Sequence, residues 1–291
     1  MRVSDLFGDF SGVLDVARLA DEKGVDIVYL SDHLAMSREA IDGHGNFAYP
    51  LDFAGWFEPL SGLCAIASVT KRIRLGTNIL IAPLRPAILL AKQIATLDVI
   101  SKGRADIAFG VGWNREEFSA ADMPFEGRYG YMEEQIKVCR LLWDGAPATF
   151  DGKHVQFRNL YSLPLPPQRG RIPIILGIPS TPRNISRMAR LADGWYPALK
   201  ARENLRESIS EVLGAFAAEG RDPKTVEITA ALRLPFLGST PTNVPSDPFE
   251  EAAGLISAGA TTIVGQLFPY CKTMKDIESF IERLVELKRG S

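Results

Sequence analysis

The sequence contains few of the residues that staple small proteins together or bind metals. Its 291 residues include three cysteines and three histidines. Cys64, Cys139 and Cys271 form an odd, widely spaced set without a CxxC pair, which excludes a disulfide framework and the common zinc motifs. We therefore predict three buried free thiols and no metal site.

Long apolar runs and an excess of one charge are also absent. Apolar stretches such as residues 79–83 are the length of a strand and far shorter than the ~20 residues that cross a membrane. Asp5 and Asp9 lie where a signal peptide needs an apolar segment. The 33 Lys and Arg against 35 Asp and Glu give a net charge of −2, whereas nucleic-acid-binding proteins usually carry a basic excess. We expect a cytoplasmic protein that binds neither membranes nor nucleic acid.

What remains is the composition of an ordinary globular protein. Hydrophobic residues make up 46% of the chain and charged residues 23%, which excludes disordered and collagen-like classes. A chain of this length buries about three quarters of its unfolded surface and needs no crosslinks to fold. Length alone allows two domains or one large barrel.

The hydrophobic pattern alternates between the period of a strand and the period of a helix. Strands are predicted over residues 3–7, 25–30, 73–81, 105–109, 172–176, 194–197, 226–232 and 261–264. Helices are predicted over residues 13–20, 56–69, 87–100, 131–143, 183–191, 205–218, 249–258 and 277–287. Parallel strands need such crossover helices. Eight strand–helix pairs without a polar linker favour a single α/β domain over residues 1–291, a (β/α)8 TIM barrel.

The residues beyond a minimal barrel fall in three insertions. They are residues 31–55 after the second strand, 145–170 after the fourth helix, and 233–247 after the seventh strand. The middle insertion contains a possible hairpin, TFDGKHVQF. Active sites of barrels form at the carboxyl ends of the strands, so the first and third insertions are candidate walls of a site. The middle one could fold over its mouth.

Asp32 and His33 follow the second predicted strand. An imidazole titrates near neutrality, and a neighbouring carboxylate can orient and charge the ring, so the pair suits proton transfer. The alternative is that Asp32 caps the next turn and His33 faces solvent. His44 and His154 lie in the insertions without a nearby partner, and we expect both on the surface.

Two glycine-containing loops follow later strands. Residues 110–114 (GVGWN) could let a flat ligand or a phosphate approach the backbone, or could form a tight turn. Residues 177–183 (GIPSTPR) join a strand to a helix, whose N-terminal amides attract phosphate. Ser180 or Thr181 could equally be a plain N-cap before Pro182. The HExxH, P-loop and GxSxG motifs are absent.

Together these motifs resemble the bacterial luciferase-like flavin and deazaflavin oxidoreductases. The resemblance spans nearly the whole chain. It rests on ARLADEKGVDIVYLSDHL, VTKRIRLGTNIL, LLAKQIATLDVISKGRADIAFGVGWNREEF, RMARLADGWYP and the helix that ends in LLW. The pattern is most similar to the branch that uses coenzyme F420, a 5-deazaflavin.

The resemblance implies a barrel that holds a flavin-type ring over its strand ends. Asp32 would contact the deazaflavin, and His33 would manage the proton at the hydride-transfer face. Asn78 and Ile79 would be joined by a cis peptide bond in a bulge behind the ring. The other residues expected to bind the cofactor are Ile81, Gly112, Trp113 and Asn114 at the ring and ribityl chain, and Gly177, Ser180, Thr181 and Arg183 at the phosphate.

Two positions depart from the family pattern. Ile178-Pro179 replaces a Gly-Gly pair that many relatives have, which indicates a less open phosphate loop. Arg115, followed by Glu116, stands where some sugar-phosphate dehydrogenases of the family have a catalytic glutamate, and this weighs against that activity.

The resulting hypothesis is an F420-dependent oxidoreductase that transfers a hydride between F420 and a small organic substrate. One alternative is an FMN-dependent monooxygenase that receives reduced flavin from a partner reductase. Another is a flavin-binding protein without turnover. Apolar Ile81 and Trp113 fit either cofactor. The resemblance also implies a homodimer.

Overall fold

The computed structural model describes residues 10–41, 56–197, 204–233, 247–267 and 270–289. Strands and helices alternate within these residues in the order that the sequence predicts. Seven strands form one parallel sheet: β1 (Ile27–Leu30), β2 (Arg74–Ile81), β3 (Ala105–Gly110), β6 (Ile174–Leu176), β7 (Gly194–Trp195), β8 (Glu227–Ala231) and β9 (Thr262–Val264). Their order across the sheet follows their order along the chain.

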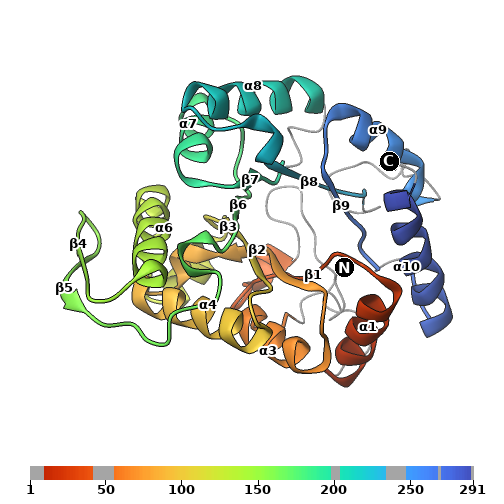
Figure 1. Cartoon of the computed structure of the whole chain (residues 1–291), viewed down its shortest axis with the longest axis horizontal. Coiled ribbons are helices and arrows are strands. Elements are labelled where there is room, and N and C mark those ends of the chain that lie inside the picture. Colours follow the sequence, from red (N-terminus) through yellow and green to blue (C-terminus); the bar gives the residue numbers. More distant parts are fainter. Residues whose placement is uncertain (1–9, 42–55, 198–203, 234–246, 268–269, 290–291) are drawn as a thin grey trace.

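The sheet is curled, and the helices form a ring around its outer side (Figure 1). Sequential parallel strands joined by outer helices are the repeating unit of a (β/α) barrel. The parallel α/β architecture is confirmed. The predicted first strand, residues 3–7, lies outside the described residues, so the complete eight-stranded barrel stays a prediction.

The helices bury their apolar faces against the curled sheet. Their bounds are α1 (Phe10–Lys23), α2 (Arg38–Ile41), α3 (Pro59–Val69), α4 (Ala87–Ser101), α5 (Arg115–Ala120), α6 (Arg128–Asp144), α7 (Pro182–Leu191), α8 (Leu205–Ala218), α9 (Ala252–Ala258) and α10 (Met274–Arg289). In α1 the residues at helical spacing, Val13, Val16, Ala17 and Ala20, are all 0% exposed. Gly24 then ends α1 with a φ of +90°, a conformation that favours glycine.

One helix begins later than the sequence pattern predicts. α3 starts at Pro59, and not at Trp56, because Glu58 caps it by accepting the Ser61 N–H at 2.7 Å. Proline fits the first turn of a helix because its missing N–H would have no partner there. Trp56 therefore lies before the helix and remains available to line the cavity described below.

The predicted hairpin is confirmed. β4 (Ala148–Asp151) and β5 (Gln156–Leu160) pair antiparallel, apart from the main sheet. The carboxylate of Glu134 in α6 accepts the backbone N–H groups of Lys153, His154 and Val155 at 2.8–2.9 Å. The turn of the hairpin is thus fixed to α6.

Strand β2 carries an irregularity near its carboxyl end. The peptide bond between Asn78 and Ile79 is cis, as the resemblance implies, and the register with β3 shifts between Thr77 and Leu80. The Thr77 hydroxyl donates to the Ala108 carbonyl at 2.9 Å and accepts the Ala108 N–H at 3.1 Å. This side chain replaces the backbone bonds that the bulge interrupts.

The other two predicted insertions lie largely outside the described residues, as does His44. Within the described part of the chain, no helix is both long enough and apolar enough to span a bilayer.

Candidate active site

A cavity of about 590 Å³ opens at the carboxyl ends of the strands. Residues at or just after the ends of β1, β2, β3, β6, β7 and β9 form its wall. The predicted site residues in this wall are Asp32, His33, Asn78, Ile79, Ile81, Gly112, Trp113 and Gly177. Local sequence patterns thus located the strand ends that meet at this cavity.

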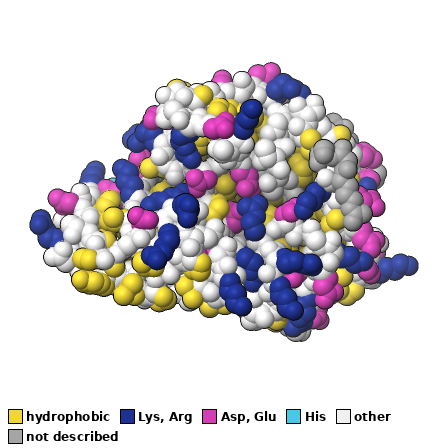
Figure 2. All heavy atoms as spheres, viewed as in Figure 1, with side chains coloured by type: hydrophobic (Ala, Val, Ile, Leu, Met, Phe, Trp, Pro, Cys, Tyr) yellow, Lys and Arg dark blue, Asp and Glu magenta, His cyan; other side chains and the backbone are white. Residues whose placement is uncertain are grey.

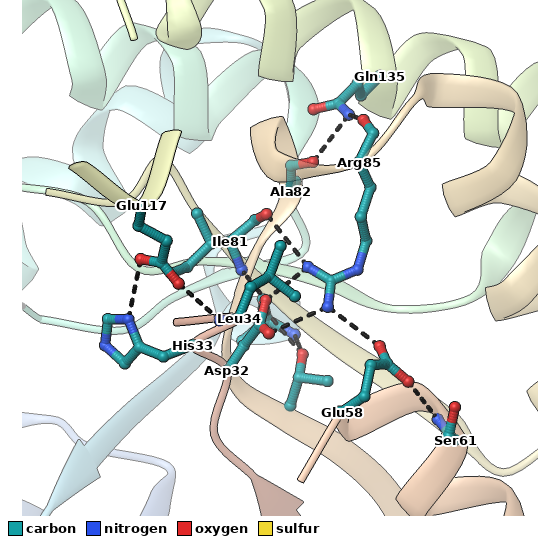
Figure 3. Close-up of polar contacts among 12 residues, drawn as sticks. Asp32, His33, Leu34, Glu58, Ser61, Ile81, Ala82, Arg85, Glu117 and Gln135 are labelled. Carbon is teal, nitrogen blue, oxygen red and sulfur yellow. Dashed lines mark hydrogen bonds and ion pairs between the residues drawn. The ribbon is translucent and has the colours of Figure 1, made fainter. Parts of the chain in front are cut away.

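His33 is held by a carboxylate that the sequence did not reveal. Oε2 of Glu117 lies 3.1 Å from the ring Nδ1, and Oε1 accepts the Leu34 N–H at 2.6 Å (Figure 3). The Glu117 side chain is fully buried and that of His33 is 10% exposed. A carboxylate can only accept a hydrogen bond, so it keeps the proton of the neutral ring on Nδ1 and leaves Nε2 unprotonated.

Glu117 reaches His33 because α5 begins close to the end of β3. Asn114 caps this helix by accepting the Glu116 N–H at 3.1 Å. Arg115 and Glu116, the residues that the family pattern singles out at this position, are both exposed. Glu117, the third residue after the N-cap, is instead buried against the end of the neighbouring strand. Its spacing from Asn114 could have indicated this position from the sequence.

Asp32 is bound by a different partner from the one expected. Its carboxylate accepts from Arg85 Nη1 at 2.6 Å and Nη2 at 3.0 Å, and from the Ile81 N–H at 2.8 Å (Figure 3). The carboxylate found on the His33 ring is that of Glu117, so the expectation that Asp32 orients the ring is corrected. The Asp32 side chain is 0% exposed and fixes the end of β1 to the end of β2.

Arg85 joins this contact to α3. Its Nη2 donates to Oε1 of Glu58 at 3.0 Å, and its side chain is 6% exposed. Burial alone would lower the pKa of Arg85, but Asp32 and Glu58 outweigh burial and raise it. Arg85 therefore stays charged, and the buried ion pair sets the backbone on which His33 sits.

Two tryptophans flank His33. The ring centroid of Trp56 lies 4.8 Å from that of His33, with an interplanar angle of 66°. The centroid of Trp113 lies 6.0 Å away at 76°. Both tryptophans line the cavity, and their edge-on contacts restrict the position of the imidazole.

The glycines of the cavity make room for isoleucines. A Cβ on Gly177 would lie 2.1 Å from Cδ1 of Ile79, and one on Gly110 would lie 2.9 Å from Cγ2 of the same residue. A Cβ on Gly112, where φ is +69°, would lie 2.7 Å from Cγ2 of Ile81. The side chains of Ile79 and Ile81 thus occupy the space into which a Cβ would project, while all three glycines also line the cavity.

Four of the predicted site residues have other surroundings. Asn114 is buried and caps α5, and its Nδ2 has no hydrogen-bond partner among the described residues. Thr181 and Arg183 line a second cavity of about 760 Å³. Ser180 lines neither cavity.

Two side-chain hydrogen bonds hold the loop between β6 and α7. Trp195 Nε1 donates to the Ile178 carbonyl at 3.0 Å, and Asn184 Nδ2 donates to the Pro179 carbonyl at 2.9 Å.

Thr181 caps α7 by accepting the Asn184 N–H. The N-cap interpretation of Thr181 is confirmed. Pro182 has no N–H and the Ile185 N–H donates to the Thr181 carbonyl, so among the first residues of α7 the Arg183 N–H is left for an anion.

The cysteines and acidic residues give no sign of a metal site. In the described ranges no group of three or more His, Cys, Asp or Glu side chains could hold an ion. Cys139 and Cys271 are buried free thiols, and burial raises the pKa of Cys271 to about 12. Cys64 is only partly buried, which corrects the prediction of three buried thiols.

A curled parallel sheet with an apolar cavity and a buried His–Glu pair at its strand ends is an arrangement typical of the active sites of parallel α/β enzymes. The model of the luciferase-like monooxygenases matches residues 4–244, and the chain belongs to this family.

Similar proteins differ in their cofactor chemistry. An uncharacterized protein of Mycobacterium tuberculosis is 33% identical over 210 residues, which cover 71% of this chain and 74% of that protein. The F420-dependent glucose-6-phosphate dehydrogenase of Kineococcus radiotolerans is 28% identical over 229 residues, which cover 76% of this chain and 63% of that enzyme. The crystal structure of a monooxygenase from Streptomyces bottropensis has a TM-score of 0.80 at 19% identity, with 100% of both chains covered. The chain is an oxidoreductase.

The cavity fits the ring of a flavin or a deazaflavin. Ile79 and Ile81 give it an apolar floor that the adjacent glycines hold in place. Arg128, Tyr129 and Pro179 line both cavities, so a ring in the first could extend a phosphate toward the second. These residues suit a flat apolar group with an anionic chain.

Proposed function

We propose that this protein is an F420-dependent oxidoreductase that transfers a hydride between coenzyme F420 and a small organic substrate. The observation that carries the proposal is His33, whose ring proton Glu117 fixes in the wall of an apolar cavity. The relative named as an F420-dependent dehydrogenase supports the choice of cofactor.

F420 would supply the hydride chemistry, since a deazaflavin carries two electrons as a hydride. His33 would accept or donate the accompanying proton at Nε2, because Nδ1 is bound to Glu117. The Glu117 carboxylate would stabilise the imidazolium that forms on proton uptake. Trp56 and Trp113 would exclude water from the histidine.

The remaining site residues would bind and position the cofactor. We assign the ring to Asn78, Ile79, Ile81, Gly112 and Trp113, with Asn114 fixing the start of α5. We assign the phosphate to the loop of Gly177 and Ser180 and to Thr181 and Arg183 at the start of α7. Asp32 is a positioning residue, because its side chain is fully buried against Arg85.

FMN-dependent monooxygenation is the second candidate. The likeness of the whole chain to the monooxygenase from Streptomyces bottropensis favours it, and Ile81 and Trp113 would suit either ring. This activity would require a partner reductase that supplies reduced flavin.

Titration of the purified apo-protein with F420 and with FMN, followed by fluorescence, separates these candidates. We expect F420 to bind with a dissociation constant in the micromolar range or below, and more tightly than FMN. Tight binding of FMN with no binding of F420 would overturn the proposal in favour of the monooxygenase.

We also propose that the protein is a cytoplasmic homodimer. Hydrophobic side chains gather along the lower left edge of the molecule in Figure 2, the side on which Figure 1 places α4 and β5. The exposed hydrophobic residues on α4 and after β5 are Ile88, Leu89, Val99, Ile100, Tyr161 and Leu163. Lys92 of α4 donates to the Leu163 carbonyl at 2.8 Å, so the two segments form one surface. A second copy of the chain is the partner that we propose for it.

A further inference from the structure

The ring of the proposed cofactor takes up one side of the first cavity. The side chain of Ile79 from β2 lies against Gly110 of β3 and Gly177 after β6, and these three strands are adjacent in the sheet. Our assignment of the ring to Ile79 and its neighbours leaves the remaining side of the cavity for a second molecule.

That remaining side comes mainly from the two end strands of the sheet, β1 and β9. Tyr29 of β1 and Val264 of β9 are buried and pack together, and Tyr196, which follows β7, packs against them. Ser31 and Gln266 continue the lining after β1 and β9. We call these five residues the β1–β9 wall.

The side chains of the β1–β9 wall include polar groups, but none of them is charged. The polar groups are two phenols, one hydroxyl and one amide. Burial raises the pKa of Tyr29 well above its usual value, with a further rise from Asp106 and Glu227, so this phenol stays neutral at physiological pH. The wall can therefore offer hydrogen bonds to a ligand but no counter-ion.

The charged residues elsewhere in the lining of the cavity do not supply one. Asp32 pairs with Arg85, and His33 is bound to Glu117. Arg128, the remaining charged residue in the described lining, also lines the second cavity and so lies toward it. An anion buried against the β1–β9 wall would lose its hydration without gaining a partner from the described residues, and this loss weakens binding.

The surroundings of His33 are apolar where a substrate would approach the ring. The centroids of Trp56 and Trp113 lie 4.8 and 6.0 Å from that of the imidazole. Trp113 is 43% exposed, and Leu34, the residue after His33, is 46% exposed. Large apolar side chains that remain exposed beside a cavity favour contact with an apolar ligand.

We propose that the β1–β9 wall, together with His33 and Trp56, binds an uncharged substrate with an apolar body and one polarised double bond, or the reduced form of such a molecule. This substrate class rests on the proposed function, because it takes the ring of F420 as the neighbour of the substrate. Anionic compounds such as sugar phosphates would bind poorly.

The reaction balances with F420 as the redox partner. In the reductive direction, one atom of the double bond takes the hydride from reduced F420. The π electron pair moves to the other atom, which takes the proton from Nε2 of the His33 imidazolium. Oxidation of reduced F420 also releases a proton, which restores the imidazolium. The oxidative direction reverses each step.

Calorimetric titration of the F420-loaded protein with three ketones tests the substrate class. Acetophenone is uncharged and apolar, para-acetylbenzoate adds a carboxylate to the same body, and dihydroxyacetone is uncharged but polar. We expect acetophenone to bind with a dissociation constant in the millimolar range or below, and about tenfold more tightly than either of the others, because their polar groups lose hydration.

Equal or tighter binding of either polar ketone, or no binding of acetophenone, would overturn the substrate class while the F420 proposal stands. Failure of F420 itself to bind the apo-protein would instead remove the proposed function.

A charge placed in the β1–β9 wall should remove the discrimination against the carboxylate. Gln266→Lys should bind para-acetylbenzoate about tenfold more tightly than the wild type does. Gln156→Lys, which adds the same charge at an exposed position of β5, is the matched control and should keep the wild-type order. An unchanged preference in Gln266→Lys would show that the ketones bind elsewhere and would overturn the assignment of this wall.

Discussion

At the scale of single residues, the chemistry depends on the hydrogen bond between Glu117 and His33. The variant Glu117→Gln places an amide beside Nδ1, and the amide nitrogen can only donate. The imidazole would then adopt the wrong tautomer. We expect turnover to fall roughly 100-fold, while the dissociation constant of the cofactor changes little, as measured by steady-state kinetics and fluorescence titration.

Glu116→Gln is the matched control for this prediction, because Glu116 is the preceding residue and is exposed. It should keep wild-type turnover. Full activity of the Glu117 variant would show that His33 does not need a carboxylate, and a parallel loss of cofactor binding would show that Glu117 acts only on the structure.

The ion pair of Asp32 with Arg85 is the second residue-scale feature. Asp32→Asn removes one member of a buried pair and leaves Arg85 with Glu58, which is 33% exposed. We expect the free energy of unfolding to drop by about 3 kcal/mol, measured by urea denaturation. Glu58→Gln should cost less, about 1 kcal/mol. Equal costs would show that the two carboxylates share the charge of Arg85 equally.

At the scale of elements, much of the fold could be predicted from local patterns. The period-2 and period-3.6 segments located the seven strands of the sheet within a few residues, because each strand is a short apolar run beside a helix. The start of α3 was missed because apolar Trp56 continues the helical pattern while Glu58 and Pro59 set the boundary.

The contacts between elements could not be predicted in the same way. His33 and Glu117 are separated by 84 positions, and Asp32 and Arg85 by 53. These pairs exist only because parallel strands bring their carboxyl ends together. Sequence reasoning instead pairs residues that are adjacent in the chain. It therefore predicted that the Asp32 carboxylate orients the His33 ring.

A glycine in one element sets the position of a side chain from another element, and a substitution tests this. In Gly177→Ala the new Cβ would meet Cδ1 of Ile79 at 2.1 Å and push that side chain toward the ring cavity. We expect the cofactor to bind about tenfold more weakly. Adding Ile79→Val removes Cδ1 and should restore most of the affinity in the same titration. Failure of this rescue would mean that the loop backbone had moved instead.

At the scale of the whole molecule, charged side chains meet inside the curled sheet. Arg74 of β2 pairs with Asp106 of β3 and lies 3.6 Å from Glu227 of β8, although β2 and β8 are not neighbours in the sheet. Burial raises the pKa of Asp106 to about 7, against the lowering effect of Arg74 and with a further rise from Glu227 and Asp193.

This raised pKa makes stability depend on pH. An unfolded aspartate titrates near 3.9, so the unfolded chain ionises at this position before the folded chain does. The free energy of unfolding should therefore fall as the pH rises from about 4 to 7, by at most about 1.4 kcal/mol per unit. Asp106→Asn should flatten this slope in urea denaturation curves. Exposed Asp151→Asn should leave the slope unchanged, and an unchanged slope in Asp106→Asn would contradict the prediction.

The exposed apolar surface on α4 and after β5 sets the expected assembly. Leu89 is 48% exposed and Leu163 is 59% exposed, and a carboxylate at the centre of an apolar contact would be buried without a partner. We expect Leu89→Asp to convert a dimer into a monomer in sedimentation velocity. The control is Met274→Asp, because Met274 begins α10 on the other side of the molecule (Figure 1) and is 41% exposed. If the wild type sediments as a monomer, this surface serves another purpose. If Leu89→Asp stays dimeric, the two copies meet through a different face, and the exposed side chains of α4 do not form the interface.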